Sequence, residues 1–174
     1  MTKIVLKNVR LSFASLFRKA TFGGEETKYE GTFLIDKVEQ ADQIKLIEKV
    51  ISELQKEKKI KLLPDKICLK DGDFIDYDGY AGTMSIKASN SRRPMLLDKD
   101  RTALMEDDGK PYSGCYVNAV INLWFQDNSW GKRINASLTG VQFASDGKPF
   151  GENSSSASID DFSDLEETEE VDFL

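Results

Sequence analysis

The sequence predicts a mainly β domain, a small barrel of about five strands with one α-helix inserted after the second strand. Three observations lead to this prediction. Short β-rich segments follow one another along the chain, a single helical stripe interrupts them, and two long alternating segments flank residue 130. This order of elements fits a barrel better than a parallel α/β sheet, in which helices alternate regularly with strands.

The first two strands are expected at residues 3–13 and 29–36, where β-branched and apolar residues are dense. A loop with several charges and the pair Gly23-Gly24 separates them at residues 18–28.

A helix is expected directly after the second strand. Asp36 can cap it, and Glu39 stands three residues further on, as in a capping box. The apolar residues at three- and four-residue spacing are Val38, Ala41, Ile44, Ile47, Ile51 and Leu54. Pro64 ends the segment.

The second half of the body predicts a strand and then a long hairpin. Residues 67–80 are turn-rich and acidic, and a strand follows at 82–89, where apolar and polar residues alternate. The hairpin arms are residues 114–126 and 132–143, and the turn between them contains asparagine and glycine.

Charge divides the chain into two parts. The formal net charge is −6, but all 24 lysines and arginines lie at or before Lys148, and nine of the 30 acidic residues lie after Gly151. The body therefore carries 24 cationic against 21 anionic side chains, a net of +3, and the remainder carries −9. We predict a nucleic-acid-binding domain over residues 1–150 and a flexible acidic tail over 151–174.

The tail is expected to be disordered, because its serine-rich start and acidic remainder hold too few apolar groups to form a core. Apolar residues nevertheless punctuate the acids, and Asp172, Phe173 and Leu174 form a candidate partner-binding element. We favour a docking peptide or a DNA mimic over a tail that serves solubility alone.

The amino-acid composition argues against several classes of function. The chain has no histidine, which excludes nucleophile–histidine pairs and histidine metal sites, and no cofactor is expected. Cys68 and Cys115 are interpreted as reduced thiols. There is no signal-peptide pattern and no apolar run near the roughly 20 residues that span a bilayer. We therefore expect a soluble, cytoplasmic protein, a non-enzyme that does not engage membranes.

The outward face of the hairpin carries the residue types that single-stranded nucleic acid requires. Tyr116, Asn122 and Trp124 point away from the inward apolar set, and aromatic rings can stack on bases while cations follow phosphates. The candidate DNA-binding residues from this reasoning are Lys87, Arg92, Arg93, Tyr116, Asn122, Trp124, Trp130, Lys132 and Arg133. Period-two geometry leaves open whether Trp124 is exposed or packed in the core, whereas Trp130 falls in the hairpin turn.

Two alternatives compete with DNA binding. A metal-dependent nuclease would use the clustered carboxylates of Asp71, Asp73, Asp76 and Asp78, although solvated turn residues explain them better. The other alternative is a non-enzymatic virion or interaction protein that acts through its acidic tail.

Several motifs resemble a bacteriophage family once known only as a domain of unknown function and now understood as OB-fold single-stranded DNA-binding proteins. These motifs are Asn8-Val9-Arg10-Leu11-Ser12-Phe13, Gly79-Tyr80-Ala81-Gly82, Ser91-Arg92-Arg93-Pro94 and Tyr112-Ser113-Gly114-Cys115-Tyr116-Val117-Asn118-Ala119. The resemblance covers residues 3–150 and adds Tyr80 and Tyr112 to the candidate DNA-binding residues.

The resemblance implies an OB-fold core that binds single-stranded DNA with little sequence preference, in phage replication, recombination and repair. Phage proteins of this group carry acidic tails that recruit replication or recombination proteins and compete with DNA. The expected site of action is then the host cytoplasm. The oligomeric state stays open, a homodimer included.

Overall fold

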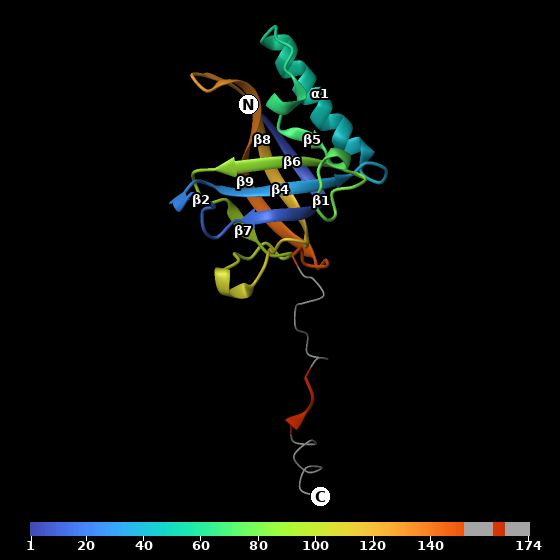
Figure 1. Ribbon diagram of the computed structural model, residues 1–174, viewed down its shortest axis with the longest axis vertical. Helices are drawn as coiled ribbons and strands as arrows, with labels where there is room; N and C mark the ends of the chain where they lie inside the picture. Colours follow the sequence, from blue (N-terminus) through green and yellow to red (C-terminus); the bar gives the residue numbers. More distant parts are fainter. Residues whose placement is uncertain (152–161, 166–174) are drawn as a thin grey trace, which may run out of the picture.

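The computed structural model describes residues 1–151 and 162–165 (Figure 1). Of the predicted tail it therefore includes Gly151 and a short stretch in which Phe162 and Leu165 are exposed. The predictions for Asp172, Phe173 and Leu174, and for tail disorder, lie outside the described residues. The domain boundary near residue 150 stays a prediction.

Five strands close into a barrel, as the sequence predicted. These strands are β1 (Thr2–Ser15), β4 (Tyr29–Asp36), β6 (Thr83–Asn90), β8 (Tyr116–Asn128) and β9 (Gly131–Ser145). Their order is β6-β4-β1-β8-β9, all antiparallel neighbours, and a parallel pairing of Ser89 with Ser137 joins β6 back to β9. The result is a mainly β, OB-fold-like barrel (Figure 1).

Four short strands were not predicted, and two of them extend the sheet of the barrel. β5 (Leu69–Asp71) pairs with β6, and β7 (Met95–Leu97) pairs in parallel with β9. β2 (Thr21–Phe22) and β3 (Glu25–Glu26) form a hairpin in the expected loop. Strands of two or three residues contain too little of the alternating pattern to be recognised in a sequence.

The barrel interior is filled by the inward side chains of the long strands. Val117, Ala119, Ile121 and Leu123 of β8 are at most 1% exposed, which confirms the predicted inward set. Leu138 of β9 lies opposite Ile121 and is equally buried. Each fully buried aliphatic side chain of this kind contributes about 1.5–3 kcal/mol, so this packing holds the outer face in place.

The inserted helix, α1 (Ala41–Glu57), follows the second barrel strand as predicted, but its start was predicted wrongly. The Asp36 carboxylate accepts the backbone N–H groups of Val38 and Glu39 at 2.9 and 2.8 Å in a turn that precedes the helix. Val38 is 85% exposed, because the chain must redirect before helical geometry begins. The described residues contain no helix long and apolar enough to cross a membrane.

Candidate nucleic-acid interface

A continuous groove crosses the outer surface of the barrel. Two cavities of about 470 and 350 Å³ adjoin there and share Cys68, Lys70 and Lys87. Trp124 and Arg133 line the larger cavity, which we call the polar end of the groove; the smaller cavity is the aromatic end. Volumes of this size accommodate nucleotide-sized groups.

The polar end and the shared middle of the groove are rich in cations. Its cationic lining residues are Lys28, Lys66, Lys70, Lys87 and Arg133. Lys87 pairs with Glu30 at 3.2 Å, and Lys66 pairs with Asp65 at 4.0 Å. Among the described residues, the side chains of Lys70 and Arg133 reach only the Asp65 carbonyl, each at 3.5 Å. Cations that lack close carboxylate partners remain available for phosphates.

The aromatic end presents two open rings that the sequence did not predict as site residues. Phe13 and Tyr77 are 55% and 58% exposed, and their ring centroids lie 5.0 Å apart in an edge-to-face arrangement. Phe13 has a left-handed backbone (φ 48°) where the pairing of β1 with β4 shifts register between Ser12 and Ser15. Phe13 belongs to the apolar strand expected at residues 3–13. The irregularity turns its side chain to the surface.

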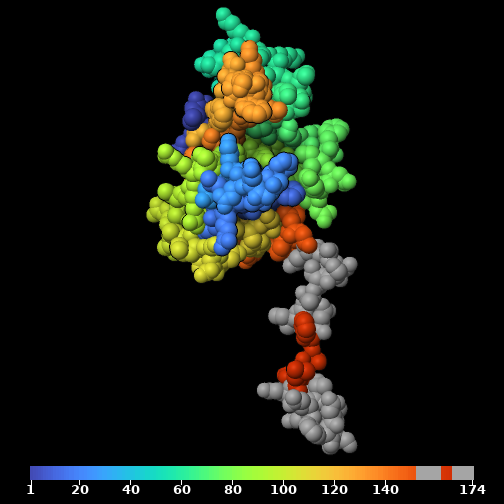
Figure 2. Space-filling view, turned by 60° about the vertical axis from the view of Figure 1, so that its left-hand side comes forward, coloured from blue at the N-terminus to red at the C-terminus, as the bar shows by residue number. Residues whose placement is uncertain are grey.

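The two tryptophans lie at different distances from the groove. Trp124 lines the polar end and is partly buried, and Asn135 lies opposite it on β9. Trp130 is 84% exposed at the tip of the β8–β9 hairpin, outside the lining of the groove. Figure 1 and Figure 2 show the tip of this hairpin (orange) at the opposite end of the body from the end of β9 (red-orange).

The predicted cations divide between the groove and its surroundings. Lys87 and Arg133 line the groove together with Trp124, and Lys132 is exposed near the hairpin tip. Arg92 and Arg93 are exposed just after β6 but do not line the groove, and the Arg93 guanidinium lies 4.9 Å from the centre of the Phe17 ring. Asn122 is partly buried and also lies outside the lining.

Three predicted tyrosines lie in the barrel wall or away from the groove. Tyr80 borders the aromatic end but is 3% exposed, and its hydroxyl lies 2.9 Å from Ser12 Oγ. The Tyr112 hydroxyl donates to Asp146 at 2.7 Å, and its ring packs against the core. Tyr116 begins β8, at the other end of the strand from Trp124. None of these rings has the open face of Phe13 or Tyr77.

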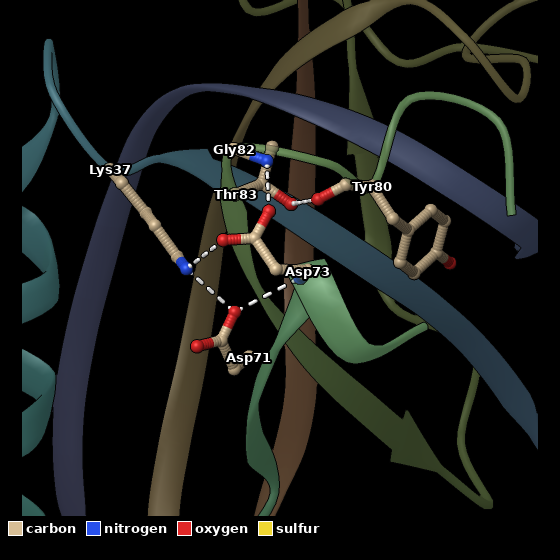
Figure 3. Close-up of polar contacts among 6 residues, drawn as sticks. All are labelled: Lys37, Asp71, Asp73, Tyr80, Gly82 and Thr83. Atoms are coloured by element: carbon tan, nitrogen blue, oxygen red, sulfur yellow. Dashed lines mark hydrogen bonds and ion pairs between the residues drawn. The ribbon is translucent and has the colours of Figure 1, made fainter. Parts of the chain in front are cut away.

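Two of the four clustered aspartates form a clamp, which we define as Lys37, Asp71, Asp73 and Gly82 (Figure 3), whereas Asp76 and Asp78 are exposed outside it. Lys37 Nζ donates to Asp71 Oδ1 and to Asp73 Oδ2, both at 2.6 Å. The Gly82 N–H donates to the other Asp73 oxygen at 2.7 Å. The hydrogen bond from Lys37 lowers the pKa of Asp71, and the Gly82 amide does the same to the pKa of Asp73. These carboxylates therefore hold the 72–82 loop in place.

The cysteine in the middle of the groove adds no charge to it. Burial raises the pKa of the Cys68 thiol to about 12, so the thiol stays protonated at neutral pH. Cys68 and Cys115 are both free, in agreement with the interpretation of the sequence.

A closed five-stranded barrel with a cationic groove and exposed rings defines a class, the OB-fold-like proteins built to hold single-stranded nucleic acid. The chain belongs to the family described as Enterobacter phage Enc34, ssDNA-binding protein, whose model matches residues 2–174. Members of this family are DNA-binding proteins without enzymatic activity, which confirms that the chain is not an enzyme and removes the nuclease alternative.

Individual relatives agree with this assignment. The chain is 36% identical to the single-stranded DNA-binding protein of bacteriophage Enc34 in a complex with ssDNA, with a TM-score of 0.79 over 86% of this chain and 89% of that one. It is 42% identical to putative protein p50 of Acyrthosiphon pisum secondary endosymbiont phage 1, over 99% of this chain and 98% of that protein. The bacteriophage T7 protein gp2.5 shares the fold at 10% identity, with a TM-score of 0.57 over 88% of this chain and 91% of that one.

Proposed function

We propose that this protein binds single-stranded DNA along the groove with little sequence preference. One observation carries the proposal: Lys70, which forms no ion pair among the described residues, lies in the shared middle of the groove, and Trp124 and Tyr77 line its two ends. Cations there would neutralise phosphates and release counterions, while rings stack on the exposed base faces. A duplex hides those faces, so single strands are preferred.

The relatives support this proposal. The Enc34 protein, which shares 36% of its aligned residues with this chain, has been solved with ssDNA bound. We further propose that the protein acts in phage DNA replication, recombination and repair, in the host cytoplasm. These roles require a protein that covers unpaired strands regardless of their sequence, and stacking tolerates every base.

For the tail we propose competition with DNA. Gly151 lines a third cavity of about 360 Å³ together with Phe13 and Tyr77, so the tail starts beside the aromatic end of the groove. A tethered segment with nine acidic residues is present there at a high effective concentration. DNA would displace it and free Asp172, Phe173 and Leu174 for a replication or recombination protein.

The test is a titration of the full-length protein into a fluorescent dT oligonucleotide and a matched duplex at two salt concentrations, followed by anisotropy and tryptophan quenching. We expect salt-sensitive binding that favours the single strand and quenches fluorescence. Absence of binding by both the full-length and the tail-less protein would contradict the proposal and favour an interaction protein. Sedimentation of the same samples measures whether copies pair as a homodimer.

A further inference from the structure

The indole N–H of Trp124 has no hydrogen-bond acceptor. Within residues 1–151 and 162–165, Trp124 Nε1 is the one buried side-chain nitrogen or oxygen that lacks a partner. Buried polar groups in folded proteins are nearly always paired, and an exception calls for a functional explanation. This exception lies in the wall of the polar end of the groove.

The residues next to Trp124 do not supply the missing acceptor. Asn135 faces Trp124 across the β8–β9 ladder, and its Nδ2 donates to Gln126 Oε1 at 2.6 Å. The Gln126 amide in turn donates to Asn128 Oδ1 and to the Gly131 carbonyl, at 3.2 and 3.3 Å. The amides around Trp124 are therefore bonded to one another and to the hairpin turn rather than to the indole.

We propose that the Trp124 N–H donates a hydrogen bond to an oxygen of the bound DNA strand. This inference rests on the proposed function and adds a directional contact to the stacking expected of the ring. The acceptor is a phosphodiester oxygen or a base carbonyl, since both offer the same lone-pair chemistry. The N–H is shielded from solvent in the free protein, so the strand reaches it only when the side chains around it shift.

The chain offers an internal control, because its second tryptophan, Trp130, is 84% exposed. The two indole N–H signals are followed in a ¹H–¹⁵N correlation spectrum of the full-length protein during titration with a dT oligonucleotide, and they are assigned with Trp124→Phe and Trp130→Phe. We expect a downfield shift of the Trp124 proton on binding that exceeds the shift of the Trp130 proton.

Trp124→Phe keeps an aromatic ring but removes the donor, and we expect it to weaken dT binding by about two- to tenfold, the usual loss for one hydrogen bond. A thermal melt of the same variant shows that it is folded. Repeating the measurement on an abasic oligonucleotide identifies the acceptor. A loss that persists there indicates a phosphate oxygen, and a loss that disappears indicates a base carbonyl.

Two results would overturn the proposal while leaving groove binding intact. In the first, the Trp124 N–H signal does not move on DNA binding and Trp124→Phe binds within twofold of wild type, while Lys87→Glu still weakens binding strongly. The other is a Trp124 signal that moves in the free Asn135→Ala variant, since Asn135 would then be the partner of the indole. Normal binding by Lys87→Glu would instead contradict the proposed function and this inference together.

Discussion

Lys70 and Asp71 are neighbours in β5, yet they belong to two charged regions with opposite character. Lys70 lies in the shared middle of the groove, and the one hydrogen bond of its side chain among the described residues is a 3.5 Å contact to the Asp65 carbonyl. Asp71 lies in the clamp and accepts from Lys37 at 2.6 Å. Successive residues of a strand point to opposite faces, so one charge meets the groove and the other meets the clamp.

The comparison shows that a cluster of charges identifies a binding surface only when those charges lack partners. The carboxylates of Asp71 and Asp73 share the charge of Lys37 and accept backbone N–H groups, so several of their acceptor positions are already occupied within the protein. In the groove, by contrast, Lys70 and Arg133 form no ion pair with any carboxylate of the described residues, and their side chains contact the Asp65 carbonyl at 3.5 Å. Five predictions test this contrast.

The largest effect is expected from reversing charge in the middle of the groove. Lys70→Glu combined with Lys87→Glu should weaken binding to a dT oligonucleotide by about 100-fold or more at low salt, because two phosphate contacts are replaced by repulsion. The slope of log affinity against log salt should fall by about one per lost contact. Anisotropy titrations at several salt concentrations measure both quantities.

The matched control for this variant is Lys45→Glu with Lys49→Glu, two lysines of α1 that do not line the groove. It changes the net charge equally. If both double variants lose the same affinity, the effect is one of overall charge and the groove is not the DNA path.

A smaller effect is expected at the aromatic end. Tyr77→Ala should weaken single-strand binding roughly tenfold, within the usual range for one stacked base, and leave the melting temperature nearly unchanged. Phe74→Ala is the control, because Phe74 is 89% exposed in the same part of the chain but does not line the groove. Equal losses in the two variants would argue against stacking on Tyr77.

Removal of the tail should have a modest effect of the opposite sign. Truncation after Gly151 is expected to tighten dT binding by about two- to tenfold at low salt, and the difference should shrink as salt screens the acids. A full-length variant with its nine tail carboxylates changed to amides should behave like the truncation. Unchanged affinity in both proteins would remove the competition model.

The smallest effect on DNA binding is expected from the clamp. Lys37→Met should lower the melting temperature but change single-strand affinity less than about threefold. None of the clamp residues lines the groove, and the Tyr77 ring keeps its contacts with Phe13 and Tyr80. Asp76→Asn, at an exposed carboxylate in the same loop, should leave both properties unchanged. A large loss of affinity in folded Lys37→Met would place the clamp in the DNA site.

The clamp also predicts a pH dependence of stability. The pKa values of Asp71 and Asp73 are lowered, so their contribution is complete above about pH 4 and is lost as pH falls through the folded-state pKa. Hydrogen bonds to Asp71 and Asp73 raise the pKa of Lys37, so its contribution is complete below about pH 10 and is lost at higher pH. Melting curves of wild type and Lys37→Met should therefore converge at both extremes.

Sequence reasoning was most successful where a pattern is long and local. The inward set of β8 and the insertion of α1 after β4 both followed from periodicity. Phe13 was missed as a site residue because its left-handed backbone reverses the direction that alternation implies. Tyr77 stands between two aspartates in a turn. An aromatic residue in such a polar turn has no core to join, and this was the sequence feature that could have marked it as a site residue.

The site was predicted in part. Trp124, Lys87 and Arg133 were singled out from the sequence, and the structure brings them to one groove. Tyr80 and Tyr112 came from the family motifs, and the structure places the first within the barrel wall and bonds the second to Asp146. Lys70 and Tyr77 were not predicted as groove residues. Their positions are set by β5 and by the clamped loop, which are too short or too irregular to show a sequence pattern.

The sequence by itself determined the class of fold, the inward faces of the long strands and the division into a cationic body and an acidic tail, because alternation, helical period and charge are local properties. Only the tertiary structure decided which charges share a surface. Lys70, Lys87 and Trp124 come from β5, β6 and β8, and the pairing of β6 with β9 brings them together. That closure joins residues about fifty positions apart, and no local pattern encodes it.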